Sequence, residues 1–190
     1  MSRLPYLRHD QLDADGQRVW DSIVDTRGER VILPDGAGLS GPFNSFVHAP
    51  GVGEHLSALG AAIRFKGTLD NALRELAICT VAGRWQAEFE WAAHARMARE
   101  LGISDAVLDA IAQGGEPSFA ADDQRTVYTV ARQLVQTGKV TPEAYEAAQR
   151  LLGDRSLVEL VSLCGYYCTI SFLLNTFGVP LPPGAKPTWG

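Results

Sequence analysis

The chain has 190 residues, of which 46% are hydrophobic and 21% are charged, an ordinary balance for a globular protein. The net charge of -5 and the scattered lysines and arginines argue against a nucleic-acid partner or an anionic membrane surface, because either would favour a basic patch. No signal peptide is visible in the opening residues, and no apolar run reaches the length needed to cross a bilayer. We therefore expect one cytoplasmic domain, spanning 1–190, with no nucleic-acid or membrane partner.

Helix signals recur along the chain, and strand signals are nearly absent. Capping residues, glycine stops and apolar residues at three-to-four spacing mark the predicted helices. The expected N-caps are Asp13, Asp70, Ser104, Asp122 or Asp123, Thr141 and Asp154. The predicted helices span about 13–26, 42–48, 50–65, 70–84, 87–101, 105–113, 122–137, 142–153 and 154–177. The sequence therefore predicts an all-α protein.

Two segments differ from this helical pattern. Residues 30–53 are dense in glycine and proline, and long irregular segments in compact domains are often functional. The proline-rich segment 179–190 is too short to fold alone, so we expect it to pack on its own chain or on a neighbour. The most apolar run, 157–177, is interrupted by polar residues and is expected to form a buried core helix.

A short internal repeat supports the helix boundaries. The segments DNALREL (70–76) and DRSLVEL (154–160) align with a shift of 84 residues, which superposes Asp70 on Asp154 and Glu75 on Glu159. Both copies start a predicted helix at a capping aspartate. We infer a duplicated helical unit, in which only the first copy keeps a histidine downstream.

The segment AEFEWAAH (87–94) places ionisable groups in an alanine-rich helix. Glu90 and His94 are four residues apart and share a helix face, whereas Glu88 is turned away and is expected to be solvated. Glu75 lies on the preceding predicted helix. If the chain reverses near 83–86, the two helices pack side by side and Glu75 approaches His94.

A carboxylate beside an imidazole has two uses. It fixes one tautomer and raises the basicity of the histidine, which can then transfer a proton near neutral pH. Alternatively, the Glu75 and His94 pair is a structural hydrogen bond between two helices. Spacing alone leaves both interpretations open.

The segment RELAICTVAGRWQAEFEWAAHARMARELGIS (74–104) resembles the core motif of the carboxymuconolactone decarboxylase and alkylhydroperoxidase D superfamily. In the peroxidase branch the motif is a glutamate, then C-x-x-C, then a histidine. Glu75 and His94 match the outer positions, while Ala87 and Glu90 hold the cysteine positions. The segments GPFNSFVHAP and GYYCTISFLLNTFGVPLP are also similar to a decarboxylase-like branch, so the resemblance covers about 10–183. It implies an alkylhydroperoxidase D-like helical bundle.

This resemblance implies a cofactor-independent lyase or other proton-transfer enzyme for a small carboxylated lactone or a related unsaturated or keto acid. His94 would be the acid–base group, Glu75 would orient it, and Glu90 would handle a proton or bind a substrate hydroxyl. The further candidate substrate contacts are Trp85, Phe43, Asn44, Phe46, His48 and Trp91. The resemblance also implies a homo-oligomer, a trimer or a hexamer.

The candidate substrate contacts have structural alternatives. Aromatic residues such as Phe43, Phe46 and Trp91 are more often core or subunit-interface residues, and His48 at a helix end could simply interact with the terminal carbonyls. The whole scaffold could also serve a non-catalytic small-molecule binding or interaction protein.

Metal and thiol chemistry are the remaining alternatives. Glu75, Glu90 and His94 with His48 or His55 could form a metal cluster, but no H-x-x-x-H or H-E-x-x-H pair exists, so we expect no metal and a solvent-facing His55. A thiol-dependent peroxidase is disfavoured because the chain has no C-x-x-C. Its three cysteines, Cys79, Cys164 and Cys168, fall inside helical patterns typical of core residues.

Overall fold

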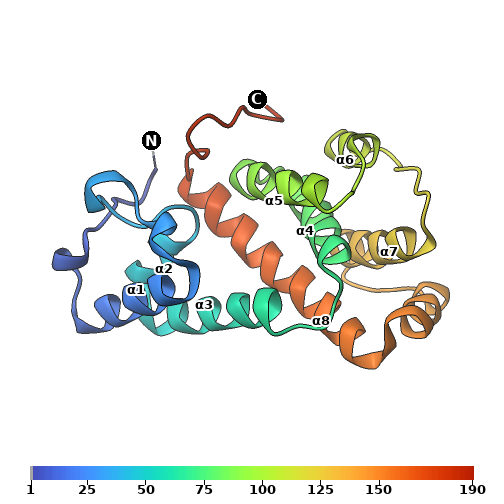
Figure 1. Cartoon of the computed structure of the whole chain (residues 1–190), viewed down its shortest axis with the longest axis horizontal. Helices are drawn as coiled ribbons and strands as arrows, with labels where there is room; N and C mark the ends of the chain where they lie inside the picture. Colours follow the sequence, from blue (N-terminus) through green and yellow to red (C-terminus); the bar gives the residue numbers. More distant parts are fainter. Residues whose placement is uncertain (1) are drawn as a thin grey trace. The chain divides into compact units, whose positions relative to one another are not determined.

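The computed structural model describes residues 2–190, and this range contains helices and no strand (Figure 1). The helices are α1 (Ala14–Arg27), α2 (Phe43–His48), α3 (Pro50–Phe65), α4 (Asn71–Trp85), α5 (Glu88–Glu100), α6 (Asp105–Ala112), α7 (Asp122–Thr137) and α8 (Pro142–Phe177). Short 3₁₀ turns occupy His9–Gln11, Glu29–Val31 and Pro34–Gly36. The all-α prediction is confirmed, and the predicted helix boundaries lie within about two residues of the observed ones.

Side-chain caps start most of the helices where the sequence predicts them. Asp13 accepts from the Gly16 N–H, and Ser104 accepts from the Val107 N–H. Asp70 accepts from two backbone N–H groups of the first turn of α4, at 2.8 and 3.2 Å. The prediction for α7 is wrong, because Ala121 is its N-cap and makes no side-chain bond. Asp122 and Asp123 lie one position later, in the first turn, where carboxylates interact favourably with the helix dipole.

The chain forms two compact units, and the first comprises residues up to Lys66 together with 173–180. Its core includes Ile23 and Phe46, which are fully or almost fully buried. Helices α2 and α3 approach so closely that a Cβ on Gly53 would lie 2.2 Å from the Phe46 carbonyl oxygen, so only glycine fits there. The Arg3 N–H donates to the Phe177 carbonyl, which ties the two ends of this unit together.

The second unit comprises Gly67–Phe172 and Leu181–Gly190. Helix α4 is its central element and packs on α5, α6 and α7. Its side chains are buried almost all round, which explains the long run of core residues from Leu76 to Ala82. The two repeat copies agree in burial, since Leu76 and Leu160 are both inaccessible to solvent. The prediction of a single domain over 1–190 stays a prediction.

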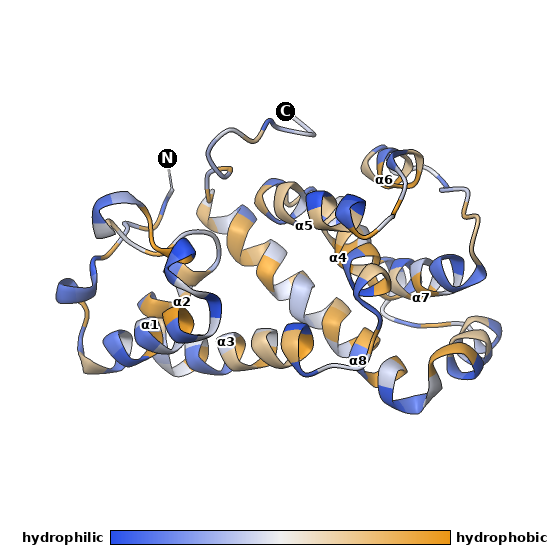
Figure 2. Cartoon of the chain, in the orientation of Figure 1, coloured by the Kyte–Doolittle hydropathy of each residue, from blue (hydrophilic) through white to orange (hydrophobic). Residues whose placement is uncertain are grey.

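Helix α8 is interrupted at Gly153, whose φ of 70° and ψ of 169° break the helical backbone. The prediction that no segment is apolar enough to span a bilayer is corrected, because α8 is long and apolar enough to do so by length and composition (Figure 2). The polar residues that interrupt the run include few charges, so they lower its hydropathy only slightly. A core helix meets the same criterion, and the buried Leu163 and Ile170 fit the predicted core helix.

The proline-rich tail packs on its own chain. The backbone N–H groups of Thr188 and Trp189 donate to the Glu88 carboxylate at 2.7–3.0 Å. The Trp189 indole donates to the Ala112 carbonyl, and its ring packs edge-on against Trp91 at 5.2 Å. Glu88 is therefore an anchor for the tail, and the prediction that it is simply solvated is wrong.

Candidate functional site

Glu75, Glu90 and His94 come from two successive helices that reverse direction at one left-handed residue. Gln86 closes α4 with φ 48° and ψ 45°, and its N–H bonds the carbonyls of the last turn. Helices α4 and α5 then pack side by side in the second unit. Glu75 projects from α4, whereas Glu90 and His94 lie four residues apart on α5, as the spacing predicts.

The structure brings these three side chains into direct contact. His94 Nδ1 lies 2.5 Å from Glu75 Oε2, and His94 Nε2 lies 2.8 Å from Glu90 Oε1. The three residues are only 1%, 4% and 6% exposed for Glu75, Glu90 and His94, respectively. Both imidazole nitrogens are thus held by carboxylates inside the protein, and charge-assisted bonds of this kind are the strong ones.

The electrostatic environment favours a protonated His94. Burial alone lowers the pKa of His94 and is the largest single effect. The negative charge of Glu90 and the hydrogen bonds to Glu75 and Glu90 together outweigh it, so the pKa of His94 is raised. An imidazolium that donates to both carboxylates satisfies all three groups.

Two further residues complete the site and were not predicted. Arg74 donates to Glu75 Oε1 at 3.4 Å and to Asn71 at 2.8 Å, so it places a cation behind the deepest carboxylate. Tyr167 of α8 packs its ring edge-on against the His94 ring, with centroids 5.2 Å apart. Arg74 adjoins Glu75 in the sequence and could have been considered, whereas no local pattern links Tyr167 to residues some seventy positions earlier.

The two candidate tryptophans lie in the second unit but in different surroundings. The Trp85 indole donates to Cys168 Sγ at 3.3 Å, and its ring packs edge-on against Phe172. Trp91 is 5% exposed and belongs to the core between α4, α5 and α6, where it meets Trp189. The core alternative therefore describes the environment of Trp91, while Trp85 stays a partly exposed candidate.

The other four candidate substrate contacts lie on α2, in the first unit. Asn44 Nδ2 and His48 Nε2 both bond the Pro5 carbonyl, at 3.1 and 2.8 Å. Phe43 and Phe46 pack edge-on, and Phe46 is buried. The buried Asn44 Oδ1 has no hydrogen-bond partner among the described residues. A role for these residues with substrate stays a prediction.

Comparison with known proteins supports the assignment of the fold and the motif. Residues 50–133 match the model of the carboxymuconolactone decarboxylase family. A crystal structure of an alkylhydroperoxidase AhpD core, an uncharacterized peroxidase-related protein from Ralstonia eutropha JMP134, is 18% identical and covers 96% of this chain and 93% of its own, with a TM-score of 0.73. The chain therefore carries a segment similar to the carboxymuconolactone decarboxylase family and shares the alkylhydroperoxidase D-like helical fold.

Two other solved structures share the fold. A protein of unknown function from Agrobacterium tumefaciens, described as a putative antioxidant defence protein AhpD, is 14% identical and covers 75% of this chain and 99% of its own, with a TM-score of 0.65. The debrominase Bmp8 is 10% identical and covers 94% of this chain and 91% of its own, with a TM-score of 0.69. No curated protein matches. The family and these neighbours fit an enzyme-like function on this fold.

The three cysteines are free thiols. Cys79 and Cys164 are buried, and Cys168 is half-buried. Burial raises the pKa of all three thiols, for Cys164 to about 12, so none is a thiolate near neutral pH. Glu90 occupies a cysteine position of the peroxidase motif, and none of these three cysteines supplies a reactive thiolate in its place.

The metal-cluster alternative finds no support in the geometry. Within residues 2–190, no three His, Cys, Asp or Glu side chains are grouped so as to hold a metal ion. His94 directs its two nitrogens to separate carboxylates, and His55 is exposed on α3, as predicted.

Proposed function

We propose that this protein is a cofactor-independent acid–base enzyme in which Glu90, His94 and Glu75 form a proton relay. One observation carries the proposal: a buried imidazole has a carboxylate on each nitrogen, at 2.5 and 2.8 Å. A structural tie between α4 and α5 requires only the Glu75 bond, because Glu90 and His94 already lie on the same helix. The second carboxylate adds a route for a proton.

Each side chain of the proposed relay has a separate role in proton transfer. Glu75 holds Nδ1–H and so fixes the tautomer that presents Nε2 to Glu90. Since Nε2 is occupied by Glu90, a substrate exchanges its proton with the Glu90 carboxyl group, which His94 then restores. Arg74 stabilises the negative charge of Glu75 throughout the cycle. Glu90 would thus do acid–base work at the position where the peroxidase motif has a cysteine.

The chemistry that suits this relay is decarboxylation or isomerisation of a small carboxylated lactone or a related unsaturated or keto acid. In decarboxylation, the bond between the carboxylate and the adjacent carbon breaks, and its electron pair moves into the conjugated carbonyl to give an enolate. His94 passes its Nε2 proton to Glu90, which donates it to that carbon as CO₂ leaves, and a proton from solvent then restores the His94 imidazolium. General acid–base help of this kind contributes about 10²- to 10⁴-fold in rate.

The remaining parts of the proposal concern partners and location. The partner is a small-molecule substrate, and the protein is a cytoplasmic homo-oligomer. The exposed apolar side chains of α8, including Val158, Val161 and Phe172, support self-association.

A panel of carboxylated lactones, β-keto acids and unsaturated acids tests the proposal. CO₂ release reports decarboxylation, and exchange of deuterium into the substrate, followed by NMR, reports proton transfer without it. We expect turnover by the wild type, its loss in His94→Gln and Glu90→Gln, and full activity in His55→Gln, which changes an exposed histidine.

Three outcomes would contradict the relay. Full turnover by Glu90→Gln would remove Glu90 from the proton path. Saturable binding of panel compounds with no turnover, unchanged in His94→Gln, would favour a non-catalytic binding protein. Activity that disappears only when Cys168, the least buried thiol, is replaced by serine would favour thiol chemistry.

A further inference from the structure

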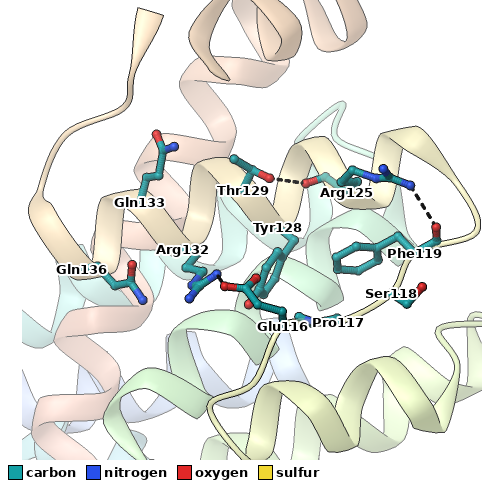
Figure 3. A pocket seen from close by; sticks show the side chains of 10 residues that line it. All are labelled: Glu116, Pro117, Ser118, Phe119, Arg125, Tyr128, Thr129, Arg132, Gln133 and Gln136. Atoms are coloured by element: carbon teal, nitrogen blue, oxygen red, sulfur yellow. Dashed lines mark hydrogen bonds and ion pairs between the residues drawn. The ribbon is translucent and has the colours of Figure 1, made fainter. Parts of the chain in front are cut away.

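A concave site lies in the second unit, between α7 and the non-helical segment that joins α6 to α7 (Figure 3). Its cavity has a volume of about 640 Å³, within the usual range of small-molecule sites, and a smaller cavity beside it shares Tyr128 and Arg132. None of the acid–base residues lines it. The pocket is therefore distinct from the cluster of Glu75, Glu90 and His94.

Two aromatic side chains, Phe119 and Tyr128, form one part of a pocket lining that is otherwise mostly polar. Phe119 and Tyr128 are each 7% exposed, and their rings are tilted by 48° with centroids 5.2 Å apart. The Tyr128 hydroxyl donates to the Gly115 carbonyl, which holds the ring in place. A flat, largely apolar group of a ligand can pack against these two rings.

The pocket also carries a cation whose partner is easy to displace. Arg132 of α7 lies over the Tyr128 ring at 5.9 Å and forms an ion pair with Glu116. The Glu116 side chain is 70% exposed and belongs to the non-helical segment, so it can move without breaking a helix. Exposed ion pairs of this type contribute little to stability.

The second arginine of the pocket has a structural task. Arg125 Nη2 donates to the Phe119 carbonyl at 3.1 Å and lies 3.8 Å from Asp122 (Figure 3). It therefore braces the segment that carries Phe119. Arg132 is the cation that an anionic ligand can reach by competing with Glu116.

We propose that this pocket binds a small aromatic carboxylate, with its ring against Phe119 and Tyr128 and its carboxylate on Arg132. The Glu116 carboxylate marks the position of the ligand carboxylate and is displaced by it. Guanidinium groups bind carboxylates through paired hydrogen bonds, and the nearby Gln136 amide supplies a further donor (Figure 3). The site is separate from the proposed acid–base relay.

Binding of benzoate to the full chain, compared with its uncharged analogue benzamide, tests the proposal. NMR signals of the Arg132 guanidinium and the Tyr128 ring should shift saturably with benzoate and not with benzamide. Arg132→Gln should weaken benzoate binding by about tenfold or more, as loss of a charge-assisted hydrogen bond does. Glu116→Gln should strengthen it by about two- to fivefold, because an exposed competing ion pair is removed.

Control variants distinguish binding at this pocket from binding elsewhere on the protein. Arg150→Gln should leave benzoate affinity within about twofold, since Arg150 is an exposed arginine that does not line the pocket. His94→Gln should bind benzoate as the wild type does, so failure of the proposed enzyme function would leave this result unchanged. No saturable shift, equal binding of benzamide, or weaker binding in Glu116→Gln would overturn the proposal. The comparison of benzoate with benzamide and the measurement on Glu116→Gln still test the proposal if Arg132→Gln does not fold.

Discussion

Replacing His94 by glutamine tests whether Glu75, Glu90 and His94 form a buried ionic unit. The substitution removes the group that lies 2.5 Å from Glu75 and 2.8 Å from Glu90, and it leaves two carboxylates that are 1% and 4% exposed. Removing one partner of a buried ion pair costs about 3–5 kcal/mol, and the loss should lie near the lower end of this range because Arg74 still pairs with Glu75. For a chain of this size the melting temperature should fall by about 6–20 °C.

Urea denaturation at about pH 6, where the imidazolium is present, measures this loss as a lower midpoint at an unchanged slope. A second variant extends the test: His94→Gln combined with Glu75→Gln and Glu90→Gln also removes the two carboxylate charges that contact His94. It should recover most of the lost stability, although it changes three residues. His55→Gln, at an exposed position, should stay within about 0.5 kcal/mol of the wild type.

A loss below about 1 kcal/mol in His94→Gln, typical of an exposed pair, would refute the buried ionic unit. A triple variant that is less stable than the single variant would also refute it. That outcome would mean that the hydrogen bonds, rather than the charges, hold α4 and α5 together.

Two further predictions concern pH and the tail. Because the pKa of His94 is raised in the folded protein, its contribution to stability is complete below the unfolded-state value of about 6.5 and is lost as pH rises through the folded value. Urea midpoints between about pH 6 and pH 9 should therefore fall more steeply for the wild type than for His94→Gln, and parallel curves would contradict the shift. Trp189→Ala removes a ring contact with Trp91 and a 2.8 Å hydrogen bond, so it should cost about 1–3 kcal/mol in chemical denaturation. Thr188→Ala, which keeps the backbone donor, should be neutral, and equal losses in the two variants would assign the effect to the backbone.

Local signals were sufficient to predict the helices and the central pair of the site. The spacing of Glu90 and His94 determines their contact, because residues four apart on a helix are neighbours. The approach of Glu75 required only one chain reversal, at Gln86, between helices of predictable length. Local helix signals were therefore sufficient to predict the contact between Glu75 and His94, which are nineteen residues apart in the sequence.

Contacts between distant segments account for the features that local patterns did not predict. Glu88 was expected to be solvated because its partners, Thr188 and Trp189, are about 100 positions away. Asn44 and His48 bond the Pro5 carbonyl, and a backbone acceptor has no sequence signature. The α7 cap was misjudged by one residue, since three polar or small residues in a row could each start the helix.

The contact between Glu88 and the tail has a consequence for the order in which this protein matures. Helix α5 carries Glu90 and His94, and its first turn is fastened by backbone groups that are synthesised 100 and 101 residues after Glu88. At about 5–20 residues per second, that delay is roughly 5–20 s on the ribosome. During this interval the nascent helix lacks the hydrogen bonds from the tail, and the Glu88 carboxylate stays in water. The first turn of the helix that carries Glu90 and His94 therefore acquires its contact with the tail at a late stage of translation, after α6, α7 and α8 have been made.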